Sequence, residues 1–317
     1  MQNQPQHPSI PNGLTPKLYV GRFAPSPTGP LHFGSLLGAL ASFLDARANG
    51  GQWLVRIEDI DPPREVAGAA QAILDCLVAH GLSWDGEVMY QSARTSIYRD
   101  ICTQLLDNGR AFFCTCSRAD LIDQQGIYSG RCRACSQQPA APYAIRLTVE
   151  DMAVGFEDAV LGHIEQSLAH EVGDFVIFRK EKLPAYQLAV VIDDAAQGVT
   201  HIVRGSDLLD STPRQIFLQR CLQYPQPFYA HIPVIANAAG QKLSKQTYAA
   251  ALAHEDAAEN LLAALSFLRQ PLPIARVGKT PHAILEWAIA QWDITRIPRQ
   301  RLLSGEQLPA PCRHFAS

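Results

Sequence analysis

Tyr19-Val-Gly-Arg-Phe-Ala-Pro-Ser-Pro-Thr-Gly-Pro-Leu-His-Phe-Gly-Ser35 is the stretch from which the fold can be predicted. Its first residues are bulky and favour a β-strand, and the prolines and glycine that follow Phe23 end any regular element. A helix is expected next, up to Asn49-Gly50-Gly51, because apolar residues recur at helical spacing at Leu36, Leu37, Leu40, Phe43 and Leu44. A strand, a turn and a helix N-terminus in this order offer free backbone N–H groups to a phosphate. His32 lies at the turn and can donate to a phosphate oxygen, although an ordinary loop with a surface histidine has the same spacing.

Length and composition indicate a globular protein with a sizeable core. The chain has 317 residues, 47% of them hydrophobic, and no apolar run approaches the length of a membrane span. Residues 1–16 are polar and contain proline, so we expect a flexible tail and not a signal peptide. The formal net charge of −3 argues against a broadly basic surface, so any RNA contact must rest on a local patch. We expect a cytoplasmic monomer that does not bind membranes.

Carboxylates follow the second predicted strand, Gln52–Glu58. This strand should run parallel to the first because a helix intervenes between them. Glu58, Asp59 and Asp61 come at its carboxyl end, which in a doubly wound sheet is the edge where ligands bind. A solvated acidic loop is the alternative. A helix should then start at Pro62, with Asp61 as its cap, and run to His80.

Two cysteine pairs lie in the middle of the chain, within an insert at about residues 110–180. The chain has eight cysteines and no signal peptide, which predicts reduced thiols and not a disulfide framework. Cys114-Thr-Cys116 followed by Cys132-Arg-Ala-Cys135 suggests a tetrahedral zinc site, with a set of free buried thiols as the alternative. Spacing alone favours these four cysteines as the ligands.

Later strands and helices complete the predicted α/β pattern. Tyr143–Leu147 and Asp174–Arg179 read as strands of the insert, and Val199–Asp207 as a strand that carries Arg204 near its end. An arginine there can bind a carboxylate through two parallel hydrogen bonds, which would select an acidic ligand. A helix is expected to begin after Ser211, with Ser211 as its cap, and further helices are expected to cover Ala257–Leu268 and Ala283–Trp292.

Two motifs give the chain a family resemblance. Arg22-Phe-Ala-Pro-Ser-Pro-Thr-Gly29 followed by His32-Phe-Gly-Ser35 resembles the ATP-binding signature of the glutamyl- and glutaminyl-type class I aminoacyl-tRNA synthetases. Gly240-Gln-Lys242-Leu-Ser-Lys245-Gln246 resembles their second, lysine-bearing loop, with leucine and glutamine in place of a methionine and the last serine. The resemblance implies a Rossmann-type catalytic domain at residues 17–250. A zinc-bearing insert would lie within it, and a short helical region without an anticodon-binding domain would follow at residues 251–317.

The resemblance also implies which side chains act. His32, Lys242 and Lys245 would be catalytic, and ATP would be bound with Mg²⁺ by Thr28, His32, Gly34, Ser35 and Lys245. Glutamate would be bound by Arg22, Phe23, Ala24, Pro25, Ser26, Glu58, Tyr186 and Arg204, with Glu58 on its amino group. The family's cysteine pattern contains a tyrosine, which implies that Cys114, Cys116, Tyr128 and Cys132 hold one structural Zn²⁺. Tyr128 and Cys135 therefore both stand as the fourth ligand.

A truncated bacterial branch of this family matches the chain in motifs and length. Its members activate L-glutamate with ATP without needing tRNA and then place the glutamyl group on queuosine in the anticodon of tRNA(Asp). The resemblance implies this activity here. A minimal glutamyl-tRNA synthetase that charges the 3′ end of tRNA(Glu) and a catalytically inactive tRNA-binding module are the alternatives. A nucleotidyltransferase of the same fold would share the His32 element but would not need Tyr186, Arg204 or the zinc insert.

Overall fold

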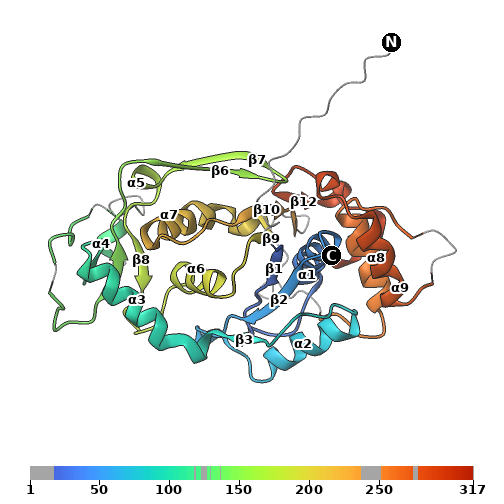
Figure 1. Ribbon diagram of the computed structural model, residues 1–317, viewed down its shortest axis with the longest axis horizontal. Coiled ribbons are helices and arrows are strands. Elements are labelled where there is room, and N and C mark those ends of the chain that lie inside the picture. The colour runs from blue at the N-terminus through green and yellow to red at the C-terminus, as the bar shows by residue number, and fades with distance from the viewer. Residues whose placement is uncertain are drawn as a thin grey trace, which may run out of the picture.

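The computed structural model describes residues 18–117, 119–122, 127–128, 130–135, 137–236, 251–273 and 278–316. The predicted N-terminal tail and the loop that carries Lys242 and Lys245 lie outside these residues. The molecule is elongated, with the insert at one end and the C-terminal helices at the other (Figure 1). Among the described residues, no helix has the length and apolar character that a membrane span requires.

A layer of parallel strands, built from two hydrogen-bonded sheets that meet edge to edge, runs through the middle of the molecule and is here described as the central sheet. Its strands, in spatial order, are β3 (Met89–Tyr90), β2 (Gln52–Ile57), β1 (Val20–Phe23), β9 (His201–Gly205) and β10 (Phe228–Ile232). The Thr200 N–H donates to the Val20 carbonyl at 2.9 Å, which joins the β1 and β9 sides. The chain moves outward from β1 to β3 and later returns on the other side of β1. The boundary between β1 and β9 is therefore a topological switch point, where open parallel sheets bind ligands.

Helices cover both faces of this sheet, because successive strand residues point to opposite sides. Trp53, Val55 and Ile57 of β2 pack into one core, whereas Val20 and Ile202 pack into the other. The first core is closed by α1 (Phe33–Ala48), α2 (Ala69–Ala79), α8 (Ala257–Phe267) and α9 (Pro281–Gln291). The second core is closed by α3 (Thr95–Asp107), α6 (Tyr186–Ala196) and α7 (Thr212–Leu222). Figure 1 shows α6 and α7 on the opposite side of β1 from α8 and α9.

The insert contains a second, antiparallel sheet. Its strands are β4 (Ala111–Cys114), β5 (Ala144–Leu147) and β8 (Phe175–Phe178), in that order. The hairpin of β6 (Ala153–Asp158) and β7 (Gly162–Ser167) returns along the molecule, and Asp158 pairs with Tyr229 of β10. Two helices of one turn, α4 (Ala119–Ile122) and α5 (Leu168–Glu171), complete this part. The two strands predicted for the insert are confirmed as β5 and β8.

The C-terminal residues pack onto the central sheet. The helices expected at Ala257–Leu268 and Ala283–Trp292 are confirmed as α8 and α9, and their apolar faces share a core with α1. A strand that sequence reasoning did not predict, β12 (Leu302–Ser304), pairs in parallel with β11 (Val234–Ala236). Because β11 follows directly on β10, this pairing holds the C-terminal residues next to the end of the central sheet.

Two local predictions are wrong. The helix expected from Pro62 is only a single 3₁₀ turn, Pro62–Arg64, and α2 begins later, after Gly68 at a φ of 78°. The Val66 N–H donates instead to the carbonyl of Pro27, at 3.0 Å, so the intervening segment binds to the turn that follows β1. Ser211 does not cap α7 with its side chain, because its hydroxyl accepts a hydrogen bond from Gln187 at 2.9 Å.

Candidate active site

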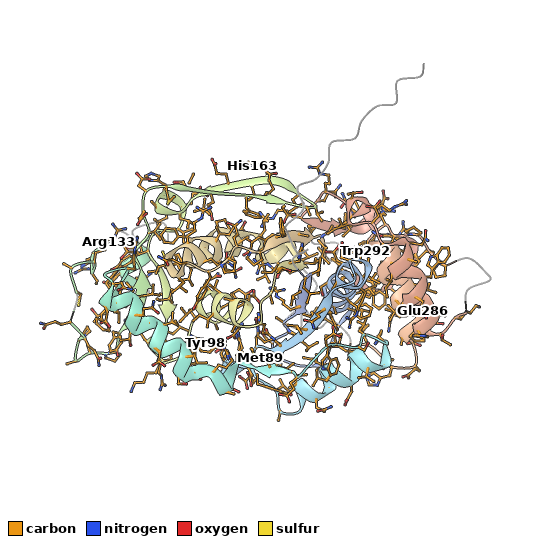
Figure 2. All side chains as sticks on the ribbon, viewed as in Figure 1. Met89, Tyr98, Arg133, His163, Glu286 and Trp292 are labelled. Atoms are coloured by element: carbon orange, nitrogen blue, oxygen red, sulfur yellow. The ribbon has the colours of Figure 1, made fainter. Side chains whose placement is uncertain are left out.

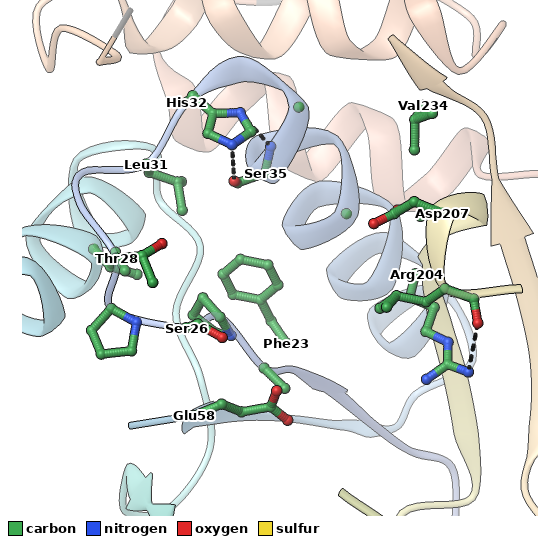
Figure 3. Close-up of a pocket in the computed structure, with 18 of the residues that line it drawn as sticks. Phe23, Ser26, Thr28, Leu31, His32, Ser35, Glu58, Arg204, Asp207 and Val234 are labelled. Atoms are coloured by element: carbon green, nitrogen blue, oxygen red, sulfur yellow. Dashed lines mark hydrogen bonds between the residues drawn. The ribbon is translucent and has the colours of Figure 1, made fainter. Parts of the chain in front are cut away.

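A cavity of about 520 Å³ opens at the carboxyl ends of β1, β2, β9 and β10. It lies at the switch point of the sheet, where the fold predicts a ligand site. All the predicted glutamate and ATP residues that the structure describes line it: Arg22, Phe23, Ala24, Pro25, Ser26, Thr28, His32, Gly34, Ser35, Glu58, Tyr186 and Arg204. Lys242 and Lys245 lie outside the described residues. Figure 3 shows His32 and Ser35 at one end of the cavity, with Glu58 and Arg204 away from them.

His32 forms the N-cap of α1. Its backbone is extended, and its Nδ1 accepts a hydrogen bond from the Ser35 N–H at 3.3 Å, while its Nε2 lies 3.1 Å from the Ser35 hydroxyl. The turn is tied to the chain beyond residue 250, because Leu252 N–H donates to the Leu31 carbonyl at 3.1 Å and His32 forms a bridge with Ala251. A helix N-terminus with a histidine cap therefore faces the cavity, which is an arrangement suited to phosphate.

Four charged side chains form a buried network beside Tyr186. Asp194 accepts from Arg56 at 2.8 Å and lies 3.4 Å from Arg22, and Arg56 also lies 3.4 Å from Glu58. Burial raises the pKa of Asp194, but Arg56 and Arg22 outweigh it and hold that pKa below its usual value. Burial dominates at Glu58, whose pKa is raised despite Arg56 and Arg22. The two arginines are thus offset by the Asp194 carboxylate, and Glu58 adds a second negative charge when it is ionised.

Arg204 differs because neutral groups hold it. Its Nε donates to His231 at 3.1 Å, and its Nη2 donates to Thr212 and Gln215, each at 2.8 Å. No carboxylate among the described residues lies within ion-pair distance of Arg204, and its buried Nη1 has no hydrogen-bond partner in this part of the chain. A buried cation without a counter-ion is costly. Since Arg204 lines the cavity, the geometry favours a ligand that brings a carboxylate or another anion.

Tyr186 is the first residue of α6 and lies on the cavity wall. Burial raises the pKa of its phenol, so the side chain is a neutral hydrogen-bonding group. The other end of α6 is fixed by Asp193, which accepts from Gln91 at 2.8 Å, from Arg94 at 2.7 Å and from Tyr98 at 2.7 Å. Tyr98 is labelled in Figure 2. The helix that presents Tyr186 is therefore held by buried polar contacts as well as by its apolar face.

Sequence reasoning missed three buried groups near the site: Arg56, Asp194 and His231. The signal for the first two is present in the sequence. Arg56 interrupts the apolar strand Trp53–Ile57, and Asp194 follows the apolar run of α6, so each is a charge at a position expected to be buried. His231 likewise interrupts the apolar strand Phe228–Ile232, but its partners come from distant segments that no local pattern indicates.

Three thiols meet in the insert. The sulfur atoms of Cys114, Cys116 and Cys132 all lie within 4.8 Å of one another. The Tyr128 hydroxyl lies 3.5 Å from the Cys114 sulfur and 3.9 Å from that of Cys116. Cys135 does not belong to this group, since its thiol donates to the Gln137 carbonyl at 3.5 Å. Three grouped sulfurs with a phenolic oxygen beside two of them are a ligand set that could hold a small, thiolate-preferring ion such as zinc.

Arg146 lies against the thiol cluster. Its Nε donates to the Cys114 sulfur at 3.3 Å, and its guanidinium stacks over the Tyr128 ring at 4.0 Å. Burial raises the pKa of the Cys114 thiol, but the Tyr128 hydroxyl and Arg146 outweigh it and lower that pKa. Close by, Asp174 accepts two hydrogen bonds from Arg133, which Figure 2 labels at this end of the molecule. The surroundings of the cluster thus favour a thiolate at Cys114.

Comparison with known proteins identifies the family. The family model of the catalytic domain of class I tRNA synthetases (E and Q) matches residues 19–299. A glutamyl-Q tRNA(Asp) synthetase of Ectopseudomonas mendocina is 53% identical over 291 residues, which cover 92% of this chain and 98% of the relative. The enzyme of that name from Neisseria gonorrhoeae is 50% identical, with 90% of this chain and 99% of the relative covered.

A solved structure agrees with the fold. A glutamate tRNA ligase from Elizabethkingia meningosepticum, crystallised in complex with its amino acid, superposes with a TM-score of 0.75 at 24% identity. The match covers 92% of this chain and 68% of that one. The predicted α/β class I synthetase fold is therefore confirmed. The chain belongs to the class I glutamyl- and glutaminyl-type tRNA synthetases and, within them, to the glutamyl-Q tRNA(Asp) synthetase family.

Proposed function

We propose that this protein activates L-glutamate with ATP, without needing tRNA, and transfers the glutamyl group to queuosine in the anticodon of tRNA(Asp). The names of relatives that match nearly their whole length support this activity. The structural observation that carries it is Arg204, a buried guanidinium that faces the cavity without a carboxylate partner in the described part of the chain.

The charges at the cavity support glutamate as the amino acid. Arg22 and Arg56 are offset by Asp194 and by Glu58 once Glu58 is ionised, which leaves Arg204 as the excess positive charge. Glutamate has two carboxylates and one ammonium group, so it brings one net negative charge. Arg204 and Arg22 would receive its carboxylates, and Glu58 its ammonium, which would also favour ionisation of the Glu58 carboxyl. Tyr186 and the segment Phe23–Ser26 would complete the pocket.

The reaction needs no protein nucleophile. An oxygen of the α-carboxylate attacks the α-phosphorus of ATP, the bond from that phosphorus to the bridging oxygen breaks, and pyrophosphate leaves with the electron pair. Queuosine then attacks the glutamyl carbonyl, and AMP leaves. The protein contributes positioning and stabilisation of phosphate charge. Mg²⁺ that accompanies ATP would offset charge on the leaving pyrophosphate.

We assign the phosphates to the His32 end of the cavity. Thr28, Gly34 and Ser35 surround His32 there and suit ATP. Lys242 and Lys245 would act on the same phosphates. The described residues on both sides of their loop support this assignment, since Ile235 lines the cavity and Ala251 forms the bridge with His32.

We infer that one structural Zn²⁺ is held by Cys114, Cys116, Cys132 and Tyr128. The support is the grouping of three sulfurs around the Tyr128 hydroxyl, together with the separate position of Cys135. Zinc would cross-link β4 to the segment that follows it and would do no chemistry at the active site. We also propose that residues 17–250 form the catalytic domain, that residues 251–317 pack onto it, and that the protein is a cytoplasmic monomer.

Exchange of radioactive pyrophosphate into ATP tests the activation step. We expect exchange that depends on L-glutamate and proceeds without tRNA, whereas glutamine and aspartate support far less. If glutamate supports no exchange, the protein is better explained as a catalytically inactive tRNA-binding module. Exchange that requires tRNA would contradict tRNA-independent activation.

A further inference from the structure

A buried histidine lies between Arg204 and a carboxylate. His231, on β10, is fully buried; its Nε2 accepts from Arg204 Nε at 3.1 Å, and its Nδ1 lies 2.6 Å from Asp158 Oδ2. Asp158, at the end of β6, is buried too, and neither residue lines the cavity. The three side chains form a continuous line from the hairpin of β6 and β7 to the cavity wall.

Hydrogen-bond chemistry settles which imidazole nitrogen carries the proton. His231 Nε2 faces both Arg204 Nε and the Thr212 hydroxyl, each at 3.1 Å. The Nε of a guanidinium can only donate, whereas the hydroxyl can also donate, so Nε2 accepts from Arg204 and carries no proton. Nδ1 then carries the proton and donates to Asp158. Burial lowers the pKa of His231 to about 4, against the opposing effect of Asp158, so the imidazole is neutral near pH 7. The line therefore holds one carboxylate, one neutral ring and one guanidinium.

Asp158 is fixed in its orientation by backbone groups. Its Oδ1 accepts from the N–H groups of Val160 at 3.0 Å, Leu161 at 2.9 Å and His231 at 3.2 Å. Only Oδ2 is left for the imidazole. The carboxylate is thus held by the turn after β6, and the ring that it orients in turn holds Arg204.

We propose that Asp158 and His231 are positioning residues that aim Arg204 and offset its charge through the ring, so that the guanidinium keeps N–H groups for the carboxylate of the amino acid. This inference rests on the proposed function. Arg22 and Arg56 are arranged differently, because each forms a direct ion pair with Asp194, which offsets its charge. A carboxylate in direct contact with Arg204 would compete with the substrate for the same N–H groups. An imidazole between the two avoids that competition.

The variant Asp158→Asn tests the line with little change in shape. Three N–H donors face Oδ1, so the amide oxygen of the asparagine must take that position and its NH₂ must face His231 Nδ1. The ring is then forced to carry its proton on Nε2, opposite the N–H of Arg204. We expect the KM for glutamate to rise by about tenfold or more, as for loss of a hydrogen bond to a charged group, with the KM for ATP unchanged.

Two readouts separate positioning from general damage. ¹⁵N NMR of the imidazole should find the proton on Nδ1 in the wild type and on Nε2 in Asp158→Asn. Asp45→Asn is the matched control, since Asp45 is a buried aspartate of α1 that accepts from Trp292 at 2.8 Å and does not line the cavity. It should leave both KM values unchanged. An unaltered KM for glutamate or an unaltered proton position in Asp158→Asn would overturn the inference.

Two variants of His231 test the positioning role if Asp158→Asn does not fold. His231→Gln keeps an acceptor near the position of Nε2, whereas His231→Asn keeps a polar group only near Nδ1. We expect His231→Gln to retain the lower KM for glutamate of the two, and equal values would overturn the inference. A wild-type protein without glutamate-dependent exchange would contradict the proposed function instead, while the NMR comparison would still judge the hydrogen-bond line.

Discussion

At the scale of single residues, the surroundings of each buried arginine decide whether it can bind a ligand. The guanidinium of Arg56 is already occupied by Asp194, Glu58 and Gln197, the last at 2.7 Å. Arg204 has only neutral partners, so its charge is still available at the cavity wall. Counting arginines in a motif would not separate these cases. The hydrogen-bond partners of each guanidinium separate an arginine held by carboxylates from one that can bind a ligand.

Arg204→Ala should abolish most of the preference for glutamate over glutamine. The kcat/KM for glutamate should fall by about 100-fold or more, because a charged hydrogen-bond partner of the substrate is lost, while the poor activity with glutamine should change little. Pyrophosphate exchange with each amino acid measures both values. Arg110→Ala is the control, since Arg110 is half exposed, pairs with Glu150 and does not line the cavity. A variant that keeps the wild-type preference would remove Arg204 from amino acid selection.

His231 should make stability depend on pH. Its folded pKa lies near 4 and its unfolded value near 6.5, so the unfolded chain binds more protons between these values and stability rises with pH there. The contribution is complete above about pH 6.5 and is lost as the pH falls towards 4, by roughly 3 kcal/mol in all. In urea titrations across this window, His231→Gln should lose less stability than the wild type. An equal loss of unfolding free energy in the two proteins across this pH window would contradict the assignment of this pH dependence to His231.

At the scale of elements, local patterns were sufficient where a motif is continuous in sequence. The βα unit that begins at β1 and the insert strands β5 and β8 follow from periodicity and from glycine and proline positions. The start of α2 was wrong because a distant contact, from Val66 to Pro27, competes with helix formation. The pairing of β12 with β11 joins segments far apart in the chain, and no local pattern indicates it.

Gly173 supports the thiol cluster through the backbone of Tyr128. A Cβ on Gly173 would lie 2.5 Å from the Tyr128 carbonyl oxygen and 2.7 Å from its nitrogen. Gly173→Ala should therefore displace Tyr128 and reduce the zinc bound from about one ion per chain. Gly198→Ala is a matched control, because Gly198 has a similar positive φ but open space around it. Metal analysis of both proteins, each checked for folding, makes the comparison. Equal zinc content would show that Tyr128 is not held for the metal.

The fourth ligand can be named by two further variants. Cys135→Ser should keep its zinc during competition with a chelator, because the Cys135 thiol bonds to Gln137 and not to the cluster. Tyr128→Phe should lose zinc faster, since it removes the hydroxyl that lies 3.5 Å from the Cys114 sulfur and 3.9 Å from the Cys116 sulfur. The reverse order would assign the site to four cysteines.

Lys245 is expected to act on the transition state. Lys245→Ala is expected to lower kcat for pyrophosphate exchange by about 100-fold or more while the KM for glutamate stays near its wild-type value, because the lysine acts on phosphate charge. Lys279→Ala, at an exposed position elsewhere in the chain, is the control. Near-normal exchange in Lys245→Ala would exclude the lysine from the mechanism.

At the scale of the whole molecule, the cavity exists because two halves of the chain meet at one sheet edge. Residues up to Glu58 line one part of the cavity and would supply the phosphate turn, Arg22 and the ammonium site, whereas residues from Tyr186 onward line the rest and would supply Arg204. Motifs predict each set separately. The network that joins them, from Arg56 to Asp194 and from Asp158 through His231 to Arg204, depends on tertiary contacts between distant segments. Sequence reasoning therefore found residues that line the cavity and missed the buried residues that hold them in place.

The acceptor of the glutamyl group is the central claim, and labelled tRNA tests it most directly. Radioactive glutamate, ATP and the protein are incubated with tRNA(Asp) from cells that make queuosine and from cells that cannot. Label should join only the first preparation and remain with the anticodon-loop fragment after nuclease digestion. Equal labelling of both preparations, or label on the 3′-terminal adenosine of tRNA(Glu), would contradict the account and make this protein a minimal glutamyl-tRNA synthetase.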